Sequence, residues 1–149
     1  MTQSYQCRSV ADTVRLGEQL ALQLRPGDII LLEGPLGSGK TTLVKGIARS
    51  LGVEAEITSP SYPIVSEYSG RCDLYHVDLY RIESFAEFEA LGLDDVMYSS
   101  NITLIEWGEK LRDRLPGVRG HLVISIGPDL SRTVGVDGLS DVEFETSEP

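Results

Sequence analysis

A glycine-rich segment between an apolar run and an apolar stripe constrains the fold of this chain more than any other part of the sequence. Residues 33–48 read EGPLGSGKTTLVKGIA, and four of them match the pattern G-x-x-x-x-G-K-[ST]: Gly34, Gly39, Lys40 and Thr41. The preceding run, DIILLE (residues 28–33), is typical of a strand covered on both faces in a parallel sheet. After the loop, apolar side chains recur at helical spacing until Gly52. The sequence therefore predicts strand, loop and helix in the order that this pattern requires.

This Gly-rich loop (residues 34–41) has the chemistry of a phosphate cradle. Its glycines let the backbone curl so that the amides from Leu36 to Thr41 point at a phosphate, and the positive end of the following helix adds attraction. Lys40 is expected to bridge the β and γ phosphates of a nucleotide, and the Thr41 hydroxyl is the expected Mg²⁺ ligand. The pattern predicts a nucleotide site but leaves open what happens to the γ phosphate.

Two carboxylates follow predicted buried strands, at the edge where an α/β sheet presents its ligands. Asp78 lies in YHVDLYR and Glu106 lies in ITLIEWGEK. Either could order the metal or its water, which would leave the other to position an attacking water. His76, two residues before Asp78 on the same strand face, is interpreted as a ligand of phosphate, a residue that orients Asp78, or a structural histidine. The residue pattern alone does not separate these roles.

The remaining periodicity predicts an α/β fold with three layers, like that of P-loop NTPases, around a mostly parallel central sheet. Further strands are predicted at residues 63–68, 73–79, 101–107, 121–126 and 132–136, and further helices at residues 13–24, 84–92 and 109–115. Ser9 or Asp12 is expected to cap the first helix, and Gly17 is expected to permit a close approach to that helix. We interpret residues 1–139 as one domain and residues 140–149 as a solvated acidic tail.

Composition excludes several classes of protein. The chain of 149 residues fits one domain, and its formal net charge of −10 has the wrong sign for a protein that itself wraps a nucleic acid. No apolar run approaches the roughly 18 residues that a membrane span needs. The start of the sequence lacks a basic and apolar secretory signal, so a cytoplasmic location is expected. Cys7 and Cys72 form no CxxC pair and predict neither a disulfide framework nor, with His76, a zinc site.

Three classes of nucleotide protein remain to be weighed. A guanine-specific switch would carry N-K-x-D, which the sequence does not contain. A small-molecule kinase would need a second pocket and an arginine-rich lid, whereas the arginines here are scattered. These absences weaken the switch and kinase interpretations. A small-molecule kinase and a nucleotide-dependent binding module without essential hydrolysis stay open as alternatives to a nucleoside triphosphatase.

The ordered motifs GPLGSGKTTLVKGIA, TSPSYPIVSEY, HVDLYR, LGLDD and IEW closely resemble the TsaE (YjeE) family, from about residue 9 to residue 136. These are P-loop ATPases of bacterial tRNA threonylcarbamoyladenosine synthesis. The resemblance implies ATP and Mg²⁺ as cofactors, and TsaB-like and TsaD-like proteins as partners. The resemblance implies that TsaD carries out carbamoyl transfer to adenosine 37 of tRNA and that ATP hydrolysis resets the complex between turnovers. The acidic charge agrees with a tRNA held by the partners.

The resemblance also implies roles for particular residues. The family's phosphate loop falls on Leu36, Gly37, Ser38, Gly39, Lys40, Thr41 and Thr42. Its Mg²⁺ ligands fall on Thr41 and Glu106, so Asp78 becomes the candidate that positions water. Segments that flank the nucleotide map to Val10, Glu109 and Arg132. A switch-like loop, whose hydroxyls would sense the γ phosphate, maps to Thr58, Ser59, Pro60 and Ser61.

Two departures from the family pattern are mild. Pro35 stands where the family often has aspartate, and it removes one amide at the variable entrance of the loop. Ser61 stands where the family has threonine, which retains the hydroxyl.

Overall fold

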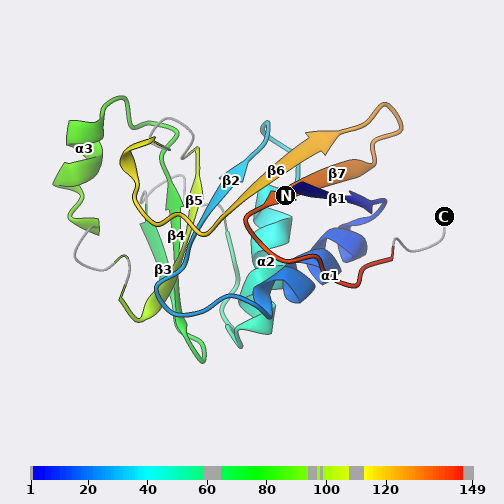
Figure 1. Cartoon of the computed structure of the whole chain (residues 1–149), viewed down its shortest axis with the longest axis horizontal. Coiled ribbons are helices and arrows are strands. Elements are labelled where there is room, and N and C mark those ends of the chain that lie inside the picture. The colour runs from blue at the N-terminus through cyan, green and yellow to red at the C-terminus, as the bar shows by residue number, and fades with distance from the viewer. Residues whose placement is uncertain (1, 59–64, 94–96, 98, 108–112, 146–149) are drawn as a thin grey trace.

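A single mixed sheet organises the part of the chain that the computed structural model describes, residues 2–58, 65–93, 97, 99–107 and 113–145. Its strand order is β1-β7-β6-β2-β5-β4-β3 (Figure 1). The elements in chain order are β1 (Thr2–Cys7), α1 (Val10–Ala21), β2 (Ile29–Glu33), α2 (Lys40–Ser50), β3 (Val65–Tyr68), β4 (Asp73–Asp78), α3 (Phe85–Ala90), β5 (Asn101–Glu106), β6 (Gly120–Ile126) and β7 (Arg132–Asp137).

The centre of the sheet is parallel, as the sequence predicts. Strand β2 pairs in parallel with β5 on one side and with β6 on the other, and β5 pairs in parallel with β4. The outer pairs β3–β4, β6–β7 and β1–β7 are antiparallel. Parallel strands end at the same edge, so the carboxyl ends of β2, β4 and β5 lie together.

Helices cover the two faces of the sheet unequally, which makes the three layers. Residues of β2 alternate between the faces: Ile30 and Leu32 belong to the core beneath α1 and α2, while Ile29 and Leu31 belong to the core that includes Phe88 of α3. Burial on both faces explains why β2 is an apolar run rather than an alternating strand. The predicted fold class is confirmed.

Helices α1 and α2 touch backbone to backbone through two glycines. A Cβ added at Gly17 would lie 2.5 Å from the Leu43 carbonyl oxygen, and one added at Gly46 would lie 2.1 Å from the Val14 carbonyl oxygen. The close approach predicted at Gly17 is confirmed, and Gly46 is its counterpart on α2. This contact fixes α2, and therefore the loop that precedes it, against the first helix.

Local signals found most elements but missed β1. Strand β1 reads TQSYQC, in which Tyr5 and Cys7 reach the core and Gln6 between them does not. It gains its hydrogen bonds from β7, at the far end of the chain, so local composition gave little sign of it.

Ser9 is the residue that caps α1, because its Oγ accepts a hydrogen bond from the Asp12 amide. Most of the helix predicted at residues 109–115 lies outside the described residues.

Residues 140–145, the described part of the predicted acidic tail, run along α1 and β1, with Val142 and Phe144 half-buried and the other four residues exposed. The side chains of Val142 and Phe144 pack against the core beneath the helices. The Phe144 ring lies edge-on to Tyr5 at 6.0 Å between ring centroids, and the Arg15 guanidinium lies 5.2 Å from the Phe144 centroid. Apolar side chains spaced two apart attach this segment despite its acidic neighbours. A domain boundary at residue 139 stays a prediction.

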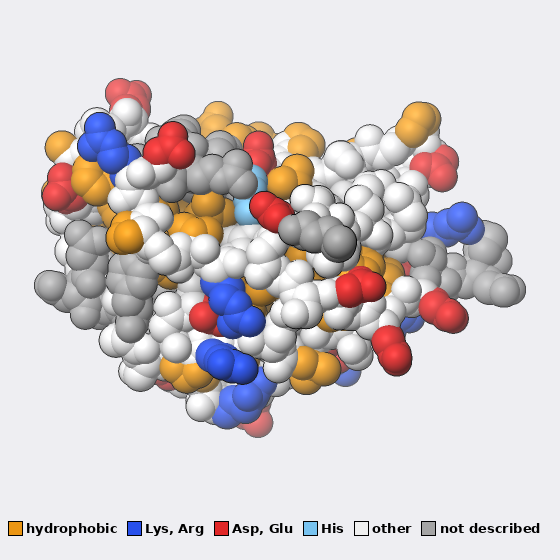
Figure 2. Space-filling view, in the orientation of Figure 1, with side chains coloured by type: hydrophobic (Ala, Val, Ile, Leu, Met, Phe, Trp, Pro, Cys, Tyr) orange, Lys and Arg blue, Asp and Glu red, His pale blue; other side chains and the backbone are white. Residues whose placement is uncertain are grey.

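The visible surface carries its charges unevenly. Figure 2 shows acidic side chains spread over this face, while most of the basic side chains lie in its lower middle, with others at the upper left and at the right. Among the described residues, no helix is long and apolar enough to cross a membrane. The thiols of Cys7 and Cys72 are both free.

The helix contact yields a test of stability. In an open helix, Gly46→Ala would stabilise by about 1 kcal/mol; here the new Cβ meets backbone that cannot move away, so we expect a loss of about 2 kcal/mol in the free energy of unfolding. Denaturant unfolding followed by circular dichroism measures it. Gly135→Ala is the control, since a Cβ added at Gly135 would come no closer than 3.8 Å to a neighbouring atom, the Val123 carbonyl oxygen. A Gly46→Ala variant as stable as the parent would contradict the close packing.

Candidate functional site

The Gly-rich loop leaves β2 and enters α2 at the carboxyl edge of the parallel strands. Gly37 and Gly39 have φ of 76° and 108°, the left-handed region that side chains other than that of glycine rarely adopt. A Cβ at either position would meet no atom within 4 Å, so the backbone conformation rather than crowding requires glycine there. Gly37 and Gly39 are therefore required by the backbone conformation of the loop.

Helix α2 begins without a side-chain cap. Gly39 occupies the N-cap position, and the first hydrogen bond inside the helix joins the Leu43 amide to the Gly39 carbonyl oxygen at 2.9 Å. The amides of Lys40, Thr41 and Thr42 precede that bond and have no helical carbonyl to bind. Free amides at the positive end of an eleven-residue helix favour an anion at this point.

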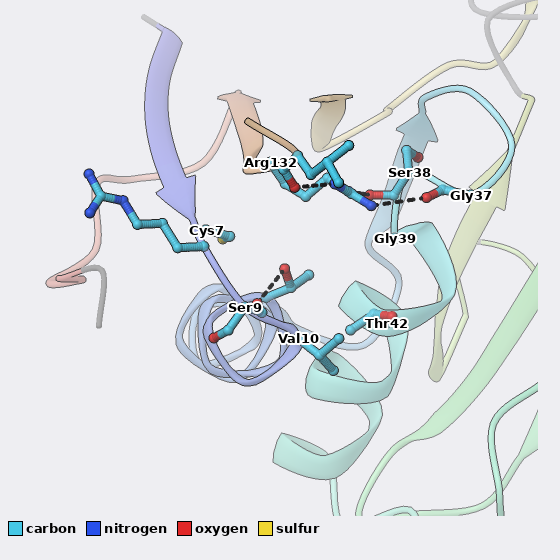
Figure 3. Close-up of a pocket in the computed structure, with 11 residues that line it drawn as sticks. Cys7, Ser9, Val10, Gly37, Ser38, Gly39, Thr42 and Arg132 are labelled. Atoms are coloured by element: carbon cyan, nitrogen blue, oxygen red, sulfur yellow. Dashed lines mark hydrogen bonds between the residues drawn. The ribbon is translucent and has the colours of Figure 1, made fainter. Parts of the chain in front are cut away.

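Arg132 anchors the Gly-rich loop through the loop's carbonyl oxygens. Its Nε donates to the Ser38 carbonyl oxygen at 2.9 Å, and its Nη2 donates to the Gly37 carbonyl oxygen at 3.4 Å (Figure 3). Its Nη1 donates to the Leu130 carbonyl oxygen in the hairpin between β6 and β7. The guanidinium thus ties the loop carbonyls to β7, which keeps those carbonyls turned away from the amides of α2.

Two adjacent pockets share the loop as a common wall. One of about 350 Å³ is lined by Leu36, Gly37, Gly39, Lys40, Thr41, Thr42 and Glu106. The other, of about 360 Å³, is lined by Cys7, Arg8, Ser9, Val10, Thr13, Gly37, Ser38, Gly39, Thr42, Leu130 and Arg132. We call them the loop pocket and the flanking pocket. Figure 3 places Val10 and Thr42 on one side of the flanking pocket and Arg132 on the other.

The predicted nucleotide residues map onto these two pockets. Every predicted loop residue lines at least one of them, and Val10 and Arg132 line the flanking pocket. Glu109, Ser59, Pro60 and Ser61 lie outside the described residues. Thr58 is described and exposed, and its amide donates to the Tyr68 hydroxyl at 3.5 Å.

The sequence did not predict that β1 and its turn into α1 form one wall of the flanking pocket. Arg8, Ser9 and Thr13 line the flanking pocket beside Val10. Burial raises the pKa of the Cys7 thiol in the same wall, which keeps that thiol protonated near neutral pH. The sequence did predict Ser9 as a possible helix cap. It could not place Ser9 at the pocket, because that position depends on the pairing of β1 with β7.

Lys40 and Glu106 meet in the loop pocket. Lys40 Nζ donates to the Gly34 carbonyl oxygen at 2.7 Å and lies 3.7 Å from Glu106 Oε1. Both side chains are buried, with exposed fractions of 6% and 3%. Strands β2 and β5 are neighbours, and α2 starts on the face to which Glu106 points, so the fold brings the two charges together. Lys40 Nζ also lies 4.1 Å from the centroid of the Trp107 ring, which packs against Tyr80.

His76 contacts Glu106. His76 Nε2 lies 2.6 Å from Glu106 Oε2, and the ring is fully buried. Residues 74, 76 and 78 of β4 and 102, 104 and 106 of β5 share one face of the sheet, and His76 reaches diagonally to the last residue of the neighbouring strand. Among the described residues, His76 bonds to Glu106 and not to Asp78, so the structure does not support the interpretation that His76 orients Asp78.

Asp78 sits beside Glu106 but differs from it in its contacts. The Cα atoms of the two residues are partners in the parallel register of β4 and β5. Asp78 Oδ1 accepts a hydrogen bond from the Tyr80 amide at 2.9 Å, which holds the turn after β4. Its side chain is half-buried and lies outside the residues that line the loop pocket. The two candidate carboxylates are thus on adjacent strands, and of the two only Glu106 lines the loop pocket.

The loop pocket suits a nucleotide-bound magnesium ion better than an ion held by protein alone. Among the described residues, no group of three or more histidine, cysteine, aspartate or glutamate side chains is placed to hold a metal. The pocket offers the Thr41 hydroxyl and the Glu106 carboxylate beside the free amides of α2. Mg²⁺ is commonly held by one or two protein oxygens together with substrate phosphates. The residues present fit that arrangement.

Comparison with known proteins decides the family. A family model described as "Threonylcarbamoyl adenosine biosynthesis protein TsaE" matches residues 7–134. The chain belongs to the TsaE family. The resemblance seen in the sequence motifs is therefore confirmed, and the family acts in the biosynthesis of threonylcarbamoyladenosine.

Individual TsaE proteins match most of the chain. A relative named tRNA threonylcarbamoyladenosine biosynthesis protein TsaE, from Treponema pallidum (strain Nichols), is 37% identical over 129 residues, which is 87% of this chain and 96% of the relative. One of the same name from Bacillus subtilis (strain 168) is 39% identical over 124 residues, 83% of this chain and 77% of the relative. The crystal structure of Bacillus subtilis YdiB matches with a TM-score of 0.75 and 32% identity, covering 91% of this chain and 84% of that one.

The Arg132 brace can be tested without any ligand. Arg132→Ala removes the donors to the Gly37 and Ser38 carbonyls, so the loop loses its tie to β7 and its amides should exchange hydrogen several-fold faster. Hydrogen exchange read by mass spectrometry on peptides spanning residues 34–42 measures the change. Arg119→Ala is the control, because Arg119 pairs with Asp28 at 2.6 Å at the opposite edge of the parallel strands. Equal exchange in the loop of both variants would rule out the brace.

Proposed function

We propose that this TsaE-family chain binds ATP with Mg²⁺ and hydrolyses it to ADP and inorganic phosphate. The observation that carries the proposal is the meeting of buried Lys40, buried Glu106 and the uncapped start of α2 in one pocket. Anion-binding amides, a cation and a carboxylate at one point are the parts that phosphoryl transfer requires. The flanking pocket, which adjoins the loop pocket along Gly37, Gly39 and Thr42, has room for the nucleoside.

Each residue then has a distinct role. The free amides and Lys40 bind the phosphates, and Lys40 exchanges its bond to the Gly34 carbonyl for one to the nucleotide. Thr41 and Glu106 would hold the Mg²⁺, which neutralises charge on the phosphates when it is bound. Asp78 Oδ1 is held by the Tyr80 amide, which leaves Oδ2 to accept a hydrogen bond from the attacking water.

We further propose that hydrolysis serves a complex of TsaB-like and TsaD-like partners that modifies tRNA in the cytoplasm. The family's role in threonylcarbamoyladenosine biosynthesis supports this setting. The net charge of −10 supports a division of labour in which a partner, rather than this chain, holds the tRNA.

The partner proposal predicts stimulation. We expect the isolated chain to release phosphate from ATP slowly, and TsaB and TsaD proteins from the same organism to raise the rate by at least about tenfold, because partner contacts complete the site. A phosphate-release assay with and without the two proteins measures this. Equal turnover in both conditions would argue strongly against coupling to that complex.

The division of roles between the carboxylates predicts different losses. Asp78→Asn should lower turnover by about 10²-fold or more while nucleotide affinity changes less than about twofold, because Asp78 acts on water. Glu106→Gln should weaken the Mg²⁺-dependent part of nucleotide binding, because it removes a metal ligand. Phosphate release and the affinity for a fluorescent ADP analogue measure the two effects. Asp73→Asn, at the opposite end of β4, is the control.

Two further measurements, tRNA modification by the carboxylate variants and the fate of labelled phosphate, separate the alternatives. If both carboxylate variants lost hydrolysis yet sustained tRNA modification over many cycles, the chain would be a nucleotide-dependent binding module. If labelled phosphate appeared on a small-molecule acceptor rather than as inorganic phosphate, the chain would be a kinase.

A further inference from the structure

The fully buried imidazole of His76 is a polar group that the proposed chemistry has not used. Its exposed fraction is 0%, and its face of β4 also carries the core residue Leu74. Nε2 bonds to Glu106 at 2.6 Å, while Nδ1 has no hydrogen-bond partner among the described residues. A buried polar atom without a partner costs about 1–3 kcal/mol. Packing alone would favour an apolar side chain here, so the bond to Glu106 is the feature that requires explanation.

The bond to His76 gives the two oxygens of Glu106 different surroundings. Oε2 faces Nε2 of His76, whereas Oε1 lies toward Lys40 Nζ at 3.7 Å. A carboxylate accepts hydrogen bonds, so Nε2 is the donor in this pair. The terminal torsion of a glutamate is otherwise broad and roughly two-fold, and the carboxylate would be free to turn both oxygens toward the lysine.

We propose that His76 is a positioning residue, which fixes the Glu106 carboxylate so that Oε1 stays directed into the loop pocket for a divalent cation. The inference rests on the proposed function of the loop pocket. When a nucleotide draws Lys40 away from Glu106, Oε1 is left in place and already oriented, because Oε2 remains bound to His76. Outer partners that orient a metal-binding carboxylate typically contribute 10- to 100-fold in metal affinity.

The test uses the full chain and a fluorescent ADP analogue, titrated in EDTA and then at increasing Mg²⁺. Three variants are compared with the parent. His76→Leu removes the donor at similar volume, His76→Gln keeps an amide donor near the position of Nε2, and His121→Leu removes the other histidine. His121 is a matched control because its Nε2 also lies close to a glutamate, Glu33 at 2.9 Å, but outside the loop pocket.

We expect His76→Leu to bind the analogue in EDTA within about twofold of the parent and to require 10- to 100-fold more Mg²⁺ for the same gain in affinity. His76→Gln should restore most of that loss, and His121→Leu should match the parent. Should His76→Leu fail to fold, His76→Asn replaces it. Its shorter amide leaves Oε2 without a donor, so it should show the same rise in the Mg²⁺ requirement.

Two results would overturn the inference while leaving the proposed function intact. One is an unchanged Mg²⁺ requirement in His76→Leu. The other is an equal loss of affinity with and without Mg²⁺, which would indicate a purely structural role. A parent chain that binds no adenine nucleotide under either condition would instead overturn the proposed function, and this inference with it.

Discussion

A loop that points its amides inward must turn its carbonyls outward, and those carbonyls need donors. In this protein Arg132 supplies donors to Gly37 and Ser38, and Lys40 supplies one to Gly34. The first of these residues comes from β7, near the end of the described chain, and the second comes from the helix that the loop itself starts. The anion-binding shape therefore depends on the whole sheet, because β7 is held in place by β6 and β1.

The two carboxylates show how neighbouring positions in one sheet acquire different chemistry. Asp78 and Glu106 end adjacent parallel strands in register. Glu106 is enclosed between Lys40 and His76, so its oxygens are directed by two buried groups. Asp78 remains half-buried and gives one oxygen to the turn that follows it. An oriented, enclosed carboxylate suits a fixed cation, and a half-buried carboxylate suits a mobile water. On this basis we assign the cation to Glu106 and the water to Asp78.

Local patterns in the sequence predicted the local parts of the fold well. The apolar run of β2, the glycines of the loop and the stripe of α2 are adjacent in the chain, so their order was sufficient. The contact of Lys40 with Glu106 could also be predicted from the sequence, because buried parallel strands end at one edge of the sheet. The pairing of His76 with Glu106 was not, since it depends on β4 and β5 being neighbours in a particular register. Strand β1 and the packing of Phe144 were missed for the same reason: both depend on contacts between distant parts of the chain.

The antiparallel pairing of β1 with β7 has a consequence for how the protein is made. Thr2–Cys7 finds its partner in Arg132–Asp137, so the first strand has no sheet to join until nearly the whole described chain exists. At about 5–20 residues per second, a ribosome needs on the order of ten seconds to supply that partner. Tyr5 and Cys7, which end in the core, stay without their native cover during that interval. The wall of the flanking pocket that β1 supplies is therefore among the last parts of the molecule to form.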